Sequence, residues 1–102
     1  MKPVALKVKD TAPSILTYRV FGEPIDITGY SFTIKIAFTP EPLVKVAEIL
    51  NQTTDDKGRF KFSWGADDLT VGQFPFEIMT TFPDSTEKTS PTMQMNVEAR
   101  IG

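Results

Sequence analysis

The sequence contains neither cysteine nor histidine. Without cysteine there are no disulfides and no thiolate metal sites, so the core alone has to hold the fold together. Without histidine the chain lacks the commonest general base and the commonest metal ligand. Catalysis would have to rest on carboxylates, lysine, tyrosine or hydroxyl groups. We therefore expect a protein that is not an enzyme and that uses no cofactor or metal.

The sequence also lacks a strong charge of one sign and a long apolar run. Its 11 basic and 13 acidic residues give a formal net charge of −2 and are interspersed. A basic stripe marks nucleic-acid binding, so its absence argues against a nucleic-acid partner. No apolar run approaches the roughly 20 residues that a membrane helix needs, and the first residues lack the apolar core of a signal peptide. No membrane partner is expected.

What the chain does contain is a series of short alternating segments with turn residues between them. Apolar side chains recur at every second position, most clearly in segments 30–38 and 58–64. This period is that of a strand with one buried face. The pattern predicts about seven strands, at 4–8, 15–20, 30–38, 43–50, 58–64, 73–82 and 93–101. One all-β domain spanning 1–102, with two antiparallel sheets packed face to face, accommodates these faces best.

The alternation also predicts the core and some backbone details. Gly58 and Gly72 follow turn residues and precede strands, so both are expected at positive φ. Pro75 cannot donate to a ladder, so it is expected at an outer edge or a bulge. The predicted core consists of the residues that share one face in each strand: Leu16, Phe32, Ile34, Ile36, Phe60, Phe62, Trp64, Phe74, Phe76, Ile78, Met95 and Val97.

Two segments leave the choice between helix and strand open. Segment 43–50 has both helical spacing and alternation, and we favour a strand with a bulge or an edge position over a short helix. Residues 66–69 fit a helical turn. Segment 43–50 has no proline and few charges to protect an edge, so Val44, Val46 and Ile49 are predicted to contact another protein. The alternative is that the segment covers the side of its own sandwich.

Other residue patterns have structural explanations that we favour over functional ones. The acidic pairs at 55–56 and 67–68 resemble turn and cap chemistry more than a cation site. Residues 51–53 match the glycosylation triplet, without a secretory signal. Trp64 could form a sugar-stacking platform with Tyr18 and Tyr30, but it is in phase with the core.

Taken together, the turn motifs resemble a known family. They are Asp-Thr-Ala-Pro at 10–13, Gly-Glu-Pro-Ile-Asp-Ile-Thr-Gly at 22–29, the strand that follows Asp-Lys-Gly at 56–58, and Val-Gly-Gln-Phe at 71–74. Their order and spacing are similar to those in the N-terminal immunoglobulin-like domain of phage baseplate upper proteins. The resemblance implies an immunoglobulin-like antiparallel β-sandwich and a non-catalytic structural role.

The function expected from this resemblance is that of a tail, baseplate or fibre assembly module. Its partners would be other virion proteins and further copies of itself, and it would be found in the virion after assembly in the bacterial host cytoplasm. The alternative is a carbohydrate-binding or adhesin-like sandwich. An exposed planar aromatic cluster would favour that alternative.

Overall fold

The structure is a computed structural model that describes residues 4–7, 13–53, 55–65 and 67–98, and of residues 4–7 only the backbone. The described residues form strands and no helix. None of them therefore belongs to a helix long and apolar enough to cross a membrane. The strands are β1 (Val4–Lys7), β2 (Ser14–Thr17), β3 (Arg19–Val20), β4 (Glu23–Pro24), β5 (Ser31–Ile36), β6 (Leu43–Val46), β7 (Glu48–Ile49), β8 (Arg59–Phe62), β9 (Gly72–Thr81), β10 (Glu87–Thr89) and β11 (Met93–Glu98).

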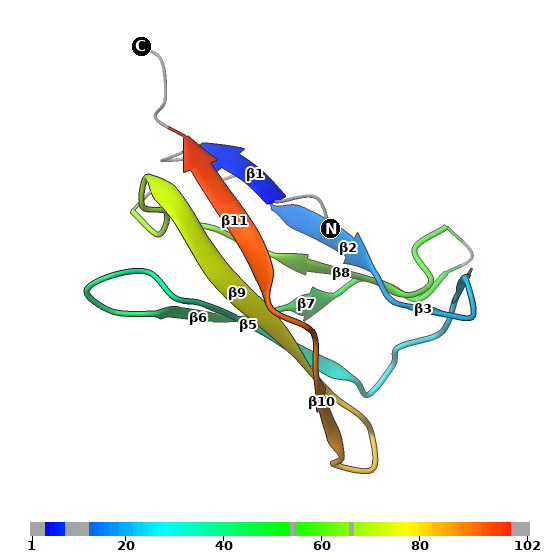
Figure 1. Cartoon of the computed structure of the whole chain (residues 1–102). Coiled ribbons are helices and arrows are strands. Elements are labelled where there is room, and N and C mark those ends of the chain that lie inside the picture. Colours follow the sequence, from blue (N-terminus) through cyan, green and yellow to red (C-terminus); the bar gives the residue numbers. More distant parts are fainter. Residues whose placement is uncertain (1–3, 8–12, 54, 66, 99–102) are drawn as a thin grey trace.

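These strands form two packed sheets and one small hairpin (Figure 1). The first sheet has the order β1-β11-β9-β5-β6, with β10 also paired to β9. The second has the order β2-β8-β7, and β3 pairs with β4. All pairs are antiparallel except β1 with β11, which is parallel. The predicted all-β, immunoglobulin-like sandwich is thus the observed fold.

The core lies between the sheets, where the alternating apolar faces meet. The rings of Phe32 on β5 and Phe60 on β8 stack with centroids 3.9 Å apart and join the two layers. Burying one such side chain contributes roughly 1.5–3 kcal/mol. Ten of the twelve predicted core residues are buried, whereas Leu16 and Phe74 are only partly buried. Three further buried residues lie outside the strands. Phe38 shares the apolar face that the alternation in 30–38 predicts, whereas the sequence did not identify Ile27 and Leu69.

Segment 43–50 forms strands, so its helical alternative is wrong. Its two halves belong to different sheets: β6 pairs with β5, and β7 pairs with β8. Ala47 lies between them and donates its N–H to the Phe32 carbonyl at 2.8 Å. The chain therefore crosses from one layer to the other within one residue, and β6 is left as an edge of the first sheet.

The helical turn expected at 66–69 is not observed as a helix in the part of it that the structure describes, residues 67–69. The Asp68 N–H donates to the Gly65 carbonyl at 3.1 Å, which closes a single reverse turn among the residues described there. The sequence Pro-Asp-Ser-Thr-Glu-Lys at 83–88 is polar and predicts a hairpin loop, but Glu87 and Lys88 already belong to β10. The polar hairpin is therefore shorter than the sequence pattern indicates.

The prediction for Pro75 is wrong, because β9 has neighbours on both sides. The carbonyl of Pro75 accepts a hydrogen bond from the Ala37 N–H at 3.0 Å, so this residue faces β5. The ladder between β5 and β9 ends at the pair Ile36 and Phe76, so Pro75 is the first residue of β9 outside it. The missing N–H therefore falls just beyond the ladder, where a proline is tolerated inside the sheet.

Candidate protein-contact surface

The edge strand β6 presents two valines to solvent. The side chains of Val44 and Val46 are 54% and 68% exposed, although both residues are apolar. They lie on the outer face of the first sheet, since the intervening Lys45 and the preceding Leu43 are on the opposite face and half-buried. No strand among the described residues pairs with the free side of β6.

Ile49, the third residue predicted for a protein contact, does not share this surface. It belongs to β7 of the second sheet and packs partly buried against the core, opposite Phe60. The change of sheet at Ala47 separates it from the two valines. The structure therefore brings Val44 and Val46 together and leaves Ile49 outside the exposed patch.

Lys45 ties β6 to the turn that follows β8. Its ammonium group lies 2.6 Å from the Asp68 carboxylate, which also accepts a hydrogen bond from the Gly65 N–H. The hydrogen bond from Lys45, followed by that from Gly65, lowers the pKa of Asp68. An inward-pointing charge of this kind is a device that limits uncontrolled pairing at an edge. It lies on the opposite face from the two valines and leaves their surface open.

At least one residue of each acidic pair has a structural partner. Asp56 pairs with Arg59 at 3.3 Å, and its carbonyl accepts the Arg59 N–H at 3.0 Å. Asp68 is held by Lys45 and Gly65, as described above. Among the described residues, no group of three or more acidic side chains is arranged to hold a metal ion. The turn and cap interpretation of the acids thus accounts for Asp56 and Asp68.

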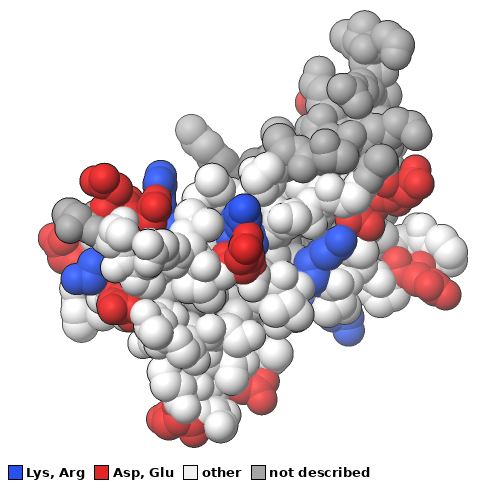
Figure 2. Space-filling view, turned by 180° about the vertical axis from the view of Figure 1, so that it is seen from behind, with Lys and Arg blue, Asp and Glu red and all other residues white. Residues whose placement is uncertain are grey.

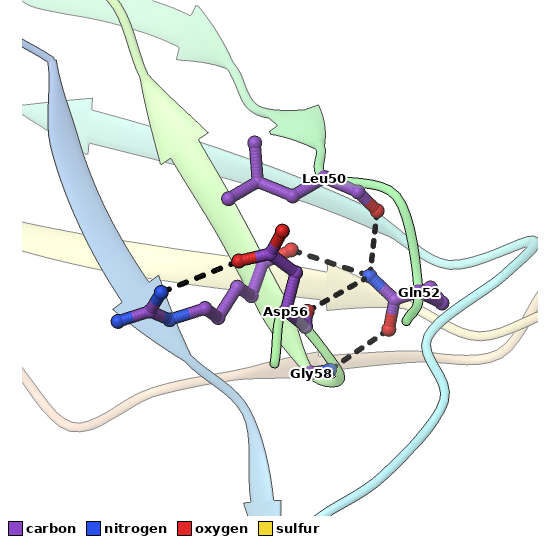
Figure 3. A network of polar contacts seen from close by, with 5 residues as sticks. Leu50, Gln52, Asp56 and Gly58 are labelled. Carbon is purple, nitrogen blue, oxygen red and sulfur yellow. Dashed lines mark hydrogen bonds and ion pairs between the residues drawn. The ribbon is translucent and has the colours of Figure 1, made fainter. Parts of the chain in front are cut away.

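The triplet at 51–53 contains a residue whose role the sequence did not indicate. The Gln52 side chain lies at the centre of a hydrogen-bond network that joins residues between 50 and 59 (Figure 3). Its Oε1 accepts the N–H groups of Ile27 at 3.1 Å and Gly58 at 2.8 Å. Its Nε2 donates to the Leu50 carbonyl at 2.7 Å and, over 3.4 Å, to those of Asp56 and Arg59. Gln52 therefore links turns that lie far apart in the sequence.

The aromatic residues do not form an exposed platform with Trp64. The Trp64 side chain is only 5% exposed, and its indole N–H donates to Ser14 Oγ at 2.9 Å. Tyr18 and Tyr30 are half-buried, with ring centroids 5.8 Å apart, and both pack against Phe32. A sugar ring needs an open aromatic face, so the carbohydrate-binding alternative loses the residue on which it depended.

One exposed aromatic residue escaped the sequence analysis. Phe21 is at the tip of the β3–β4 hairpin and is fully exposed, at 102% of its reference area. It adopts φ 50°, and Gly22 follows at φ 82°. Two successive residues at positive φ form the turn that suits a two-residue hairpin, where Asn or Asp usually precedes Gly. The sequence signal that could have identified Phe21 as exposed was a bulky residue directly before the glycine of such a turn.

On the face shown in Figure 2, the charges of the described residues do not form an extended patch of one sign. On the face in Figure 2 the basic side chains stand apart among acidic ones, and most of the surface is uncharged. On the outer face of the second sheet, Lys61 pairs with Glu48 at 3.0 Å. The described residues on the face in Figure 2 therefore offer no continuous basic track for a polyanion.

Comparison with known proteins identifies a similar fold but no family. No family model matches the chain, and no curated protein matches it. Among solved structures, CopC from Methylosinus trichosporium OB3b is similar, with a TM-score of 0.56 and 15% identity. The match covers 98% of this chain and 87% of that one. At this identity the likeness shows the β-sandwich fold alone.

Proposed function

We propose that this chain is a non-enzymatic structural module of a phage virion that acts in a tail, baseplate or fibre through protein–protein contacts. The order and spacing of the turn motifs support the virion role through their resemblance to baseplate upper proteins. The observation that carries the assembly role is the pair Val44 and Val46, exposed on a free edge strand. A free edge with apolar side chains pairs readily with another chain.

The partners would be neighbouring virion proteins and further copies of the chain. Backbone N–H and C=O groups on the free side of β6 would provide hydrogen bonds, and the valines would provide apolar contact area. The ion pair of Lys45 with Asp68 holds β6 in place before any partner arrives. The edge is thus preorganised for a contact, which lowers the entropic cost of association.

The test is the oligomeric state of the wild type and of the variant Val44→Lys/Val46→Lys by light scattering. Both side chains point outward, so the variant should remain folded while two added charges oppose association. Val71→Lys is the matched control, because Val71 is 52% exposed and lies outside β6. Association that survives in the double variant would remove β6 from the contact. A wild type that stays monomeric up to millimolar concentration would overturn self-assembly.

A further inference from the structure

A hollow opens on the side of the sandwich where β2 and β10 belong to different sheets (Figure 1). Its lining comes from β2, the start of β3, the end of β9 and the segment from β10 to Pro91. The hollow has a volume of about 330 Å³. An apolar cavity of about 150 Å³ is enough to hold benzene, so this hollow has room for a ring with polar substituents.

Thr80 places a hydroxyl group in this hollow without a partner in the fold. The residue is only 8% exposed and is the one buried residue with a polar side chain in the described part of the chain. Its hydroxyl makes no hydrogen bond with another described residue, yet the oxygen is not sealed from solvent. Because Thr80 lines the hollow, its hydroxyl is accessible from there. A buried hydroxyl without a partner is costly, and a ligand with polar groups would remove this cost.

Two cationic side chains from different elements line the same hollow. Arg19 belongs to β3, directly after β2, and Lys88 belongs to β10 in register with Thr80. Neither is paired with the carboxylate of a described residue, since Arg19 donates to the Gly22 carbonyl and the ion pairs involve other residues. The described lining contains no acidic residue. Two unpaired cations beside one hollow favour an anionic ligand.

The rest of the lining suits a sugar ring that carries the negative charge. Thr17 adds a second hydroxyl group, while Leu16, Ile78 and the half-buried Tyr18 provide apolar surface. Pockets with a largely apolar lining and a few convergent polar groups are typical of small-ligand sites. A sugar ring has both hydroxyl groups and an apolar C–H face. A phosphate ion lacks the apolar surface, and an aromatic acid lacks the hydroxyl groups.

We propose that this hollow binds an acidic sugar, a monosaccharide unit with a carboxylate group. The carboxylate lies between Arg19 and Lys88, and a ring hydroxyl forms a hydrogen bond with Thr80. Polar groups provide the recognition, so the site needs neither Trp64 nor an open aromatic platform. The inference goes beyond the proposed assembly function and does not depend on it, because no residue of β6 lines the hollow.

A titration with D-glucuronate, followed by nuclear magnetic resonance of the isotope-labelled wild type, tests the site. The backbone amide signals of Thr17, Thr80 and Lys88 should shift in a saturable manner. D-Glucose has the same ring without the carboxylate and should bind at least about tenfold more weakly, because charge-assisted hydrogen bonds are lost. Equal binding of glucose, or shifts confined to other parts of the chain, would overturn the proposal.

The variant Thr80→Val tests the buried hydroxyl without damaging the fold. Valine has a similar shape and suits a strand, so the melting temperature should stay the same or rise. The affinity for glucuronate should fall by about two- to tenfold, because one hydrogen bond is lost. Thr33→Val is the matched control, since Thr33 lies on the opposite face of the neighbouring strand β5. Wild-type affinity in Thr80→Val would overturn the proposal.

The variant Lys88→Gln tests the charge. The affinity for glucuronate should fall by about tenfold, whereas Lys35→Gln, which removes an exposed lysine of β5 outside the hollow, should bind like the wild type. Equal losses in the two variants would mean that net charge alone attracts the probe, which would overturn the proposal.

Other anions test the class of ligand. Benzoate or inorganic phosphate that binds as tightly as glucuronate would identify a general anion site and overturn the assignment to a sugar. The absence of any shift with glucuronate would overturn the site itself. These measurements are independent of self-association, so their failure would leave the assembly role of β6 to its own test.

Discussion

Single residues fix the loops of this protein through backbone hydrogen bonds. Gln52 satisfies the N–H groups of Ile27 and Gly58, and both of these residues are buried. A buried N–H without a partner costs about 1–3 kcal/mol. The Gln52 amide thus provides a hydrogen-bond acceptor for two buried N–H groups that no strand ladder pairs.

We expect Gln52→Ala to lower the free energy of unfolding by about 2–4 kcal/mol, because two buried donors lose their acceptor. The measurement is denaturant unfolding followed by tryptophan fluorescence. Asn51→Ala, at the exposed neighbouring position, should change stability by no more than about 0.5 kcal/mol. Equal effects of the two substitutions would show that the network in Figure 3 contributes little.

Gly58 and Gly22 have similar backbone angles, so comparing them separates backbone strain from steric clash at a Cβ atom. Gly58 and Gly22 have φ values of 79° and 82°, as the sequence predicted for Gly58. A Cβ at Gly58 would lie 2.7 Å from the Tyr18 carbonyl oxygen, whereas one at Gly22 would meet nothing within 4 Å. Gly72 also has a positive φ, at 137°. Gly58 and Gly22 thus have nearly equal φ values and differ in the space around a Cβ atom.

Gly22→Ala should cost about 1–2 kcal/mol, the usual penalty of a left-handed conformation. Gly58→Ala should cost at least about 1 kcal/mol more, because the backbone around Tyr18 has to shift. Thermal and denaturant unfolding of the two variants side by side measures the difference. If both lose the same stability, the close approach of Gly58 to Tyr18 is not energetically significant.

At the scale of elements, β6 is joined to the turn after β8 by an ion pair that depends on pH. The pKa of Asp68 is lowered from its ordinary value of 3.8, mainly by the hydrogen bond from Lys45. A carboxyl with a lowered pKa in the folded state stabilises the fold above its unfolded pKa. That contribution is lost as the pH falls below about 3.8 and through the folded value.

We expect Asp68→Asn to be less stable than the wild type at pH 7 and to lose less stability on acidification below pH 4. Denaturant unfolding at a series of pH values provides the comparison. Glu41→Gln, at an exposed position outside the strands, serves as the control for removing one negative charge elsewhere. Parallel curves for Asp68→Asn and the wild type would contradict a stabilising role of the ion pair at β6.

At the scale of the whole molecule, both sheets share one core. Trp64 follows β8 of the second sheet, and the buried residues of β5, β9 and β11 in the first sheet belong to the same cluster. Neither sheet buries its apolar face without the other. The two layers should therefore unfold together as one cooperative unit.

The single Trp64 makes this cooperativity measurable, since its 5% exposure couples its fluorescence to the core. Unfolding followed by Trp64 fluorescence and by far-ultraviolet circular dichroism should give coincident midpoints, as expected for a two-state domain of this size. The measurement should be made at a concentration where the protein is monomeric. Midpoints that separate would indicate that one sheet persists after the other has lost its packing.

Sequence patterns by themselves determined the longer strands, most of the core and the fold class. The short strands β4 and β10 were not predicted, so the described residues form eleven strands where about seven were expected. Alternation at every second residue shows which side chains share a face, and turn residues show where each strand ends. The inward positions of Phe32 and Phe60 follow from this information alone, because each lies in a cleanly alternating segment. The positive φ values of Gly58 and Gly72 were equally local. The turn expected at Gly72 is not observed, because this residue is the first of strand β9.

Only the tertiary structure decided how distant segments meet. The placement of Pro75 inside the sheet depends on where a different strand, β5, stops. The roles of Gln52, Ile27 and Leu69 depend on loops that folding brings together. The residue pattern of each segment alone does not predict which loops meet. The change of sheet at Ala47 divides Val44 and Val46 from Ile49 for the same reason. Periodicity encodes the faces of one segment, whereas neighbours across the fold are set by the packing of the whole chain.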